Sequence, residues 1–225
     1  MEAGPSFPIL LSLRVAAVAL AVVAPLGVGL AFVQARRRYA LHRLVDALVL
    51  LPLVLPPSVV GFFLVVAFGR RGPLGRAIEA TLGVRVVFTP AAAVLASAVV
   101  ALPILVKTAQ PAIEAVPAEL EAVGRSLGLG PAAVFFRVTL PCAWRGVLAA
   151  TVLGFARALG EFGATLMFAG NIPGLTNTMP IEIFTAYQAG DDRRAALYVA
   201  VLTALSIAVV LVAARLGPRS AAATP

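Results

Sequence analysis

Long apolar segments, separated by shorter polar ones, dominate the pattern of this chain. Five of them are long enough to cross about 30 Å of hydrocarbon as a helix, which takes roughly 20 residues. They cover residues of about 9–34, 44–69, 89–107, 143–169 and 194–215. The pattern therefore predicts an all-α integral membrane protein, residues 1–225 forming one transmembrane domain of five helices.

Composition excludes an ordinary water-soluble domain. The chain is 61% apolar and 12% charged, with a mean hydropathy of +1.00. Soluble domains are roughly half apolar and a quarter charged. The net charge of +8 fits contact with lipid headgroups, so we expect the bilayer and no nucleic acid as a partner.

Basic residues predict the orientation. One group flanks the first and last spans and the loop 112–141: Arg36, Arg37, Arg38, Arg43, Lys107, Arg125, Arg137, Arg145, Arg215 and Arg219. The opposite group is smaller: Arg70, Arg71, Arg76, Arg85, Arg193 and Arg194. Because basic residues are enriched on the cytoplasmic side, this bias of ten against six places the loop and the C-terminus in the cytoplasm and the N-terminus outside.

Residues 117–141 predict a helix, a tight turn and a second helix. Gly128 suits a left-handed C-terminal cap, and Pro131 suits a new helix start. One apolar stripe recurs at helical spacing: Val116, Leu120, Val123 and Leu127. It must be covered, either by membrane helices and headgroups or by a cleft in a separate cytoplasmic protein.

The second span contains the run Pro56, Pro57 and Ser58. Prolines remove backbone donors and free carbonyls that hydrocarbon cannot satisfy. We expect a kinked helix that faces a water-filled pathway, or a purely structural kink against a neighbour.

The fourth span contains Arg157 and Glu161, four residues apart. Side chains at this spacing meet on one helix face and can pair. The pair either lets the span tolerate its own charges or forms a polar element at a pathway or subunit interface, and intramembrane charges favour the functional interpretation.

The polar stretch 171–194 is predicted to lie outside the cell. It is rich in turn formers and carries an apolar helical patch. A soluble extracytoplasmic partner could dock here, and the candidate contacts are Asn171, Thr176, Thr178 and Phe184. A merely solvated loop is the alternative.

Other classes of function find little support. The only lysine, Lys107, does not lie in a Gly-Lys-Ser/Thr motif, so the chain has no Walker A site and does not bind ATP by that route. We expect no cofactor and no metal in this chain. An enzyme would need clustered catalytic groups, whereas His42 and Cys142 stand alone, and we expect them to be solvated and packed, respectively. A secondary transporter or channel would need a relay of intramembrane charges, for which only Arg157 and Glu161 qualify.

The loop is similar to the "EAA" loop of ABC importer permeases, whose pattern is EAA, three residues, Gly, nine residues, Ile, one residue and Leu-Pro. Gly128, Val138, Leu140 and Pro141 match that spacing. The motif's Glu falls on Ala122, and the nearest acid is Glu121. The segments 51–75 and 154–174 further resemble molybdate permeases of the oxyanion branch, with sulfate/thiosulfate permeases as close relatives.

The resemblance implies type I importer architecture and a coupling helix seated in a groove of an ATP-hydrolysing subunit. Residues then implied in coupling are Glu119, Leu120, Glu121, Val123, Gly124, Arg125, Leu127, Gly128, Pro131, Leu140 and Pro141. It also implies a homodimer in a bacterial inner membrane, two cytoplasmic ABC ATPase subunits that bind ATP and Mg²⁺, and an extracytoplasmic oxyanion-binding protein. The chain itself would be non-catalytic and would import molybdate or tungstate, with sulfate or thiosulfate as the alternative.

Overall fold

The computed structural model describes residues 4–37 and 40–216, and within them the chain is all-helical. Arg38 and Arg219, which entered the orientation argument, lie outside the described residues. The helices, in chain order, are α1 Ser6–Arg36, α2 His42–Val54, α3 Pro57–Phe68, α4 Pro73–Leu82, α5 Pro90–Glu114, α6 Ala118–Ser126, α7 Pro131–Val134, the π-helix η1 Phe135–Thr139, α8 Leu140–Leu159, α9 Gly163–Ala169, α10 Met179–Gln188 and α11 Asp192–Leu216.

In the described ranges, four helices are long and apolar enough to cross a membrane. They are α1, α5, α11 and the continuous helix Pro131–Leu159 built from α7, η1 and α8. A fifth crossing results if α2 and α3 count as one span, although they are bent by 113°. The five predicted segments are thus recovered as four helices and one broken pair.

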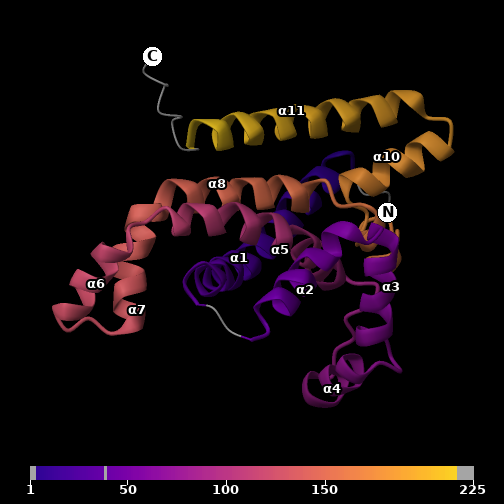
Figure 1. The fold of residues 1–225 in the computed structure, drawn as a ribbon. Coiled ribbons are helices and arrows are strands. Elements are labelled where there is room, and N and C mark those ends of the chain that lie inside the picture. Colours follow the sequence, from indigo (N-terminus) through magenta and orange to yellow (C-terminus); the bar gives the residue numbers. More distant parts are fainter. Residues whose placement is uncertain (1–3, 38–39, 217–225) are drawn as a thin grey trace.

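The break in the second span is sharper than the predicted kink. Pro56 and Pro57 cannot donate to the helical ladder, and each pushes the residue before it out of the helical region. Leu55 and Pro56 accordingly take extended ψ values of 143° and 135°. The chain turns here, and α3 runs across the end of the bundle (Figure 1).

The fourth span also differs from its predicted bounds. Its helix ends at Leu159, and α9 starts only at Gly163. In the other direction the helix reaches back to Pro131, through the π-helix η1, which ends two residues before Pro141. Because the ring nitrogen of Pro141 cannot donate a hydrogen bond, a local π register there fits the sequence.

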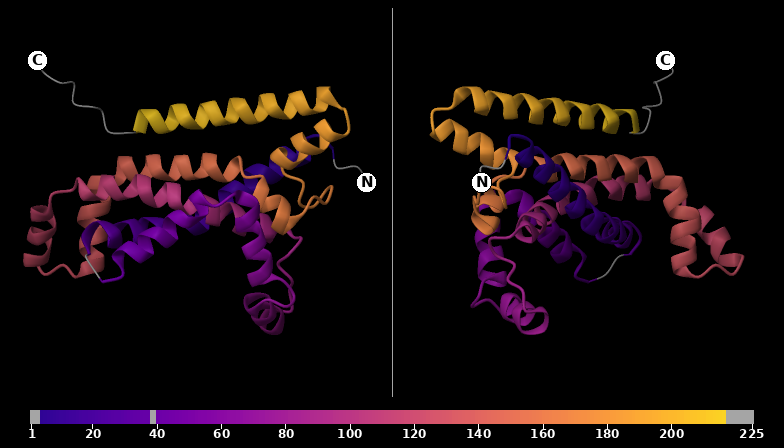
Figure 2. Two further views of the ribbon diagram at one scale, coloured as in Figure 1. Left: turned by 45° about the vertical axis from the view of Figure 1, so that its right-hand side comes forward. Right: turned by 180° about the vertical axis from the view of Figure 1, so that it is seen from behind.

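The core lies where α1, α5 and α8 pack along one another (Figures 1 and 2). Alanines line these contacts, and Ala16, Ala19 and Ala101 are buried beside the side chain of Leu105. Small residues let apolar helices approach closely, which compensates for the absence of a hydrophobic driving force in lipid.

The packing of α3 on α9 depends on Gly61. A Cβ atom there would lie 2.9 Å from both the Cα and the carbonyl oxygen of Ala164. Only glycine permits this backbone contact. It holds the broken second span against the broken fourth one.

The two ends of the bundle are distinct. The start of α1 and the α6–α7 segment lie at opposite ends, and α11 returns to the α6–α7 end (Figure 2). At the end of the bundle where α1 starts, the Tyr198 hydroxyl donates to the carbonyl of Pro5, and the Met179 N–H donates to Ser12 Oγ. These bonds tie α10 and α11 to α1.

Candidate functional site

Residues 117–141, called the end hairpin here, project from one end of the bundle (Figures 1 and 2). The predicted left-handed cap is confirmed, because Gly128 has φ +84°. The Gly128 N–H bonds the carbonyl of Arg125, and the Leu129 N–H bonds that of Gly124. This pair of bonds is a Schellman motif, and α7 begins at Pro131 as predicted.

Helix α6 turns its apolar side outward. Leu120, Val123 and Leu127 are 46%, 57% and 77% exposed. Val116, the first member of the predicted stripe, is instead buried in the core. Phe136, which the sequence did not single out, adds a further exposed ring at the same hairpin. Among the described residues, no membrane helix covers Leu120, Val123 and Leu127, which leaves this apolar face open.

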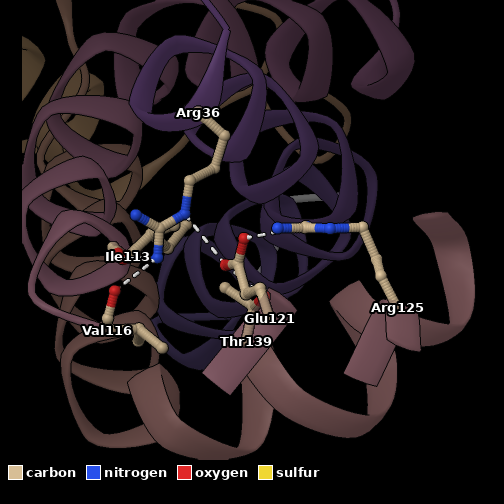
Figure 3. Close-up of polar contacts among 6 residues, drawn as sticks. All are labelled: Arg36, Ile113, Val116, Glu121, Arg125 and Thr139. Carbon is tan, nitrogen blue, oxygen red and sulfur yellow. Dashed lines mark hydrogen bonds and ion pairs between the residues drawn. The ribbon is translucent and has the colours of Figure 1, made fainter. Parts of the chain in front are cut away.

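The inner side of α6 consists of Glu121 and Gly124, its two buried residues. Glu121 is only 5% exposed. Its Oε1 accepts hydrogen bonds from Arg36 Nε at 2.9 Å and from the Thr139 hydroxyl at 2.8 Å. Its Oε2 lies 3.8 Å from Arg125 Nη1. Figure 3 shows these contacts, which we call the polar node.

Arg36 extends the polar node to the end of α5. Its Nη2 donates to the carbonyls of Ile113 at 3.0 Å and Val116 at 2.6 Å (Figure 3). These carbonyls belong to the last turn of α5 and the residues after it, where a helix leaves acceptors without intrahelical donors. The sequence marked Arg36 only as an orientation signal and did not single out Thr139. No spacing rule links residue 36 with residue 121.

The remaining implied coupling residues lie around this node. Glu119 is exposed on α6, Pro131 and Pro141 are exposed, and Leu140 is partly buried. Gly124 packs on the returning helix, since a Cβ atom there would lie 3.3 Å from Val138 Cγ2.

Arg157 and Glu161 form the predicted ion pair, with 2.8 Å between Nη2 and Oε2. Glu161 lies beyond the end of α8, in the break before α9, and its other oxygen accepts the Ala164 N–H at 2.8 Å. The carboxylate is buried, while Arg157 is partly exposed. Glu161 therefore caps α9 as well as neutralising its neighbour, which spacing alone did not reveal.

The proline run lies beside this break. Pro56, Pro57 and Ser58 are exposed in the single chain. A Cβ atom on Gly163 would lie 2.9 Å from Pro57 Cβ and 3.3 Å from the Ser58 nitrogen. The structure thus brings together two groups of predicted residues from different spans.

The outer loop places its four candidate contacts unequally. Asn171 and Phe184 are exposed, whereas Thr176 and Thr178 are buried. Thr176 Oγ1 donates to the Gly170 carbonyl and accepts the Ile172 N–H. Thr176 thus shapes the loop from inside, whereas Asn171 and Phe184 form part of its surface.

Other chemistry is sparse in the described ranges. They contain no group of three or more His, Cys, Asp or Glu side chains that could hold a metal ion. Cys142, which we expected to be packed, is exposed. Glu182, which the sequence did not single out, is buried and paired with Arg194.

Known proteins resemble this chain in sequence. A family model described as "Binding-protein-dependent transport system inner membrane component" matches residues 24–221. The molybdenum transport system permease protein ModB of Mycobacterium tuberculosis (strain H37Rv) is 44% identical over 207 residues, 92% of this chain and 78% of that protein. The protein of the same name from Escherichia coli (strain K12) is 41% identical over 205 residues, 91% of this chain and 90% of that protein.

A solved structure resembles the fold. The chain matches the inward-facing MetNI methionine ABC transporter with a TM-score of 0.64 and 17% identity, covering 93% of this chain and 94% of that one. The fold is thus that of a type I ABC importer permease, as predicted. The family match spans most of the chain, and the relatives share more than 40% of their residues with it over about nine tenths of its length. The chain therefore belongs to the multi-pass inner-membrane components of binding-protein-dependent transport systems.

Proposed function

We propose that this chain is the transmembrane permease subunit of an ATP-driven importer for molybdate or tungstate. One observation carries the proposal: relatives named molybdenum transport permeases are 41–44% identical over about nine tenths of the chain. The match includes the end hairpin and both broken spans, so it is not confined to generic apolar helices.

The substrate class sets what the permease must do. Molybdate and tungstate are tetrahedral dianions, and moving such charge into hydrocarbon is prohibitively costly. They must therefore pass through a closed, polar chamber between protein subunits. Selection among anions would then rest mainly with an extracytoplasmic oxyanion-binding protein, and this subunit would supply alternating access.

The proposed assembly is two copies of this chain, two cytoplasmic ABC ATPase subunits and the binding protein. The exposed residues Leu120, Val123 and Leu127 support the ATPase contact, because an apolar helix face outside the bundle requires a cover. The larger group of basic residues flanks the ends of the spans on the same side as the end hairpin. The end hairpin and C-terminus then lie in the cytoplasm, and the N-terminus lies outside.

The proposed mechanism is a rocking motion. ATP and Mg²⁺ bound by the ATPase subunits would draw those subunits together, and their grooves would carry the end hairpins with them. The helix Pro131–Leu159 is continuous with the hairpin, so displacement passes directly into the core. Nucleotide can shift the equilibrium only by as much as it favours one of the two states.

Uptake by reconstituted proteoliposomes tests this function. Vesicles contain this chain, its ATPase subunit and its binding protein, and radiolabelled molybdate, tungstate and sulfate are offered separately. We expect ATP-dependent uptake of molybdate and tungstate and little uptake of sulfate. Preferential sulfate uptake would reassign the substrate, and transport without the ATPase subunit would refute the importer mechanism.

A further inference from the structure

Glu121 cannot serve as a contact for a protein that docks on α6. The apolar side of α6 points outward, and Glu121 is 5% exposed on the opposite, inner side. Both of its carboxylate oxygens face groups of this same chain. Glu119, two residues earlier, is exposed and could reach a partner. The two acids of one short helix therefore have different roles.

The polar node joins elements that are distant in the sequence. Arg36 ends α1, Thr139 ends η1, and Glu121 lies in the middle of α6. Arg36 also bonds the carbonyls of Ile113 and Val116 after α5. One carboxylate thus connects the hairpin to the ends of two core helices.

Few other contacts hold α6 in place. Among the described elements it packs mainly on α7 and η1, its own neighbours in the end hairpin. The hairpin can therefore be pushed as a unit. A buried charged pair with short hydrogen bonds resists separation, because losing either partner leaves an unpaired buried charge.

We infer that Glu121 is a positioning residue that latches the end hairpin to the C-terminal end of α1. Displacement of α6 by the ATPase would then reach α1 through Arg36, in parallel with the continuous helix into α8. This inference rests on the proposed coupling role of the end hairpin. It assigns the buried acid a task inside the permease and leaves ATPase binding to the outer face.

Neutral variants separate latching from docking. Glu121→Gln and Arg36→Gln should bind the ATPase subunit with a Kd within about twofold of wild type, because the outer face is intact. Molybdate taken up per ATP hydrolysed should fall about tenfold, the loss expected for one hydrogen bond to a charged group. Glu79→Gln is the matched control, because Glu79 also pairs with an arginine, Arg85, but lies on α4, away from the end hairpin; it should change neither quantity. The double variant should lose less than the sum of the two single losses, since both single variants remove the Glu121–Arg36 interaction.

Distance measurements provide a readout that is independent of the substrate. Spin labels are attached at Arg37→Cys, beside the latch, or at Ala122→Cys on α6, in a Cys142→Ser background. Residues 37, 122 and 142 are all exposed. In the assembled complex, which contains two copies of this chain, ATP should change the distance between the two copies' labels at residue 37 and at residue 122. With Glu121→Gln, the change should persist at residue 122 and shrink at residue 37.

The outcomes are distinct. A tenfold higher Kd for Glu121→Gln would make Glu121 a docking contact and overturn the latch. The latch would also be overturned if ATP changed the distance at residue 37 as much in Glu121→Gln as in the wild type. A wild-type complex in which residue 122 does not respond to ATP would instead refute the proposed coupling function. If Glu121→Gln inserts poorly, Thr139→Val removes one donor without changing side-chain volume, and it should reduce the distance change at residue 37 in the same direction.

Discussion

Leu127 offers the sharpest test of the outer face of α6. It is 77% exposed at the end of the helix, next to the turn that a docking groove would enclose. Fully burying a leucine side chain is worth about 1.5–3 kcal/mol, and about three quarters of that gain is still available here. Leu127→Ala should forfeit most of it, roughly 1–2 kcal/mol of binding free energy. The Kd for the ATPase subunit should rise roughly 5- to 30-fold.

Leu82→Ala is the matched control. Leu82 is 70% exposed, but it ends α4, away from the end hairpin. Binding of a fluorescently labelled ATPase subunit to the permease in lipid nanodiscs gives the Kd, and membrane insertion is checked by the amount recovered. A Kd within twofold of wild type for Leu127→Ala, or equal weakening of binding by Leu82→Ala, would refute a docking role for Leu127.

Three further sets of substitutions probe the turn, the buried ion pair and the helix contact. Gly128→Val places a β-branched residue at φ +84°, which costs at least about 1–2 kcal/mol, and should abolish uptake with normal insertion; retained uptake would remove the turn from the mechanism. Arg157→Glu and Glu161→Arg should each reduce uptake, and combining them should restore part of it, whereas the absence of any rescue would argue against the pair. Gly61→Val should lower the Tm because its Cβ would meet the Ala164 backbone at 2.9 Å, while Gly29→Val, with nothing within 4 Å, should not. Equal Tm changes at the two glycines would contradict that packing.

The membrane class, the helical segments and the turn at Gly128 could all be predicted from the sequence. Each depends on local chemistry: apolar length fixes what can cross hydrocarbon, and glycine tolerates the left-handed conformation. The sequence also predicted that Arg157 and Glu161 pair, because a spacing of four residues brings side chains together. The resemblance added the family, since the hairpin and the segments around both breaks carry its pattern.

The side of α6 that faces outward could not be predicted from the sequence and follows from the packing of the fold. The periodic stripe marked an apolar face but not its direction, and the helix buries Glu121 while exposing Leu127. The reason is the partner that the fold supplies: Arg36 reaches the inner side of α6 from 85 residues away. A buried carboxylate is tolerated where an opposite charge such as Arg36 pairs with it. No local sequence pattern shows that Arg36 lies there. The breaks at Pro56 and before α9 likewise became neighbours only through packing.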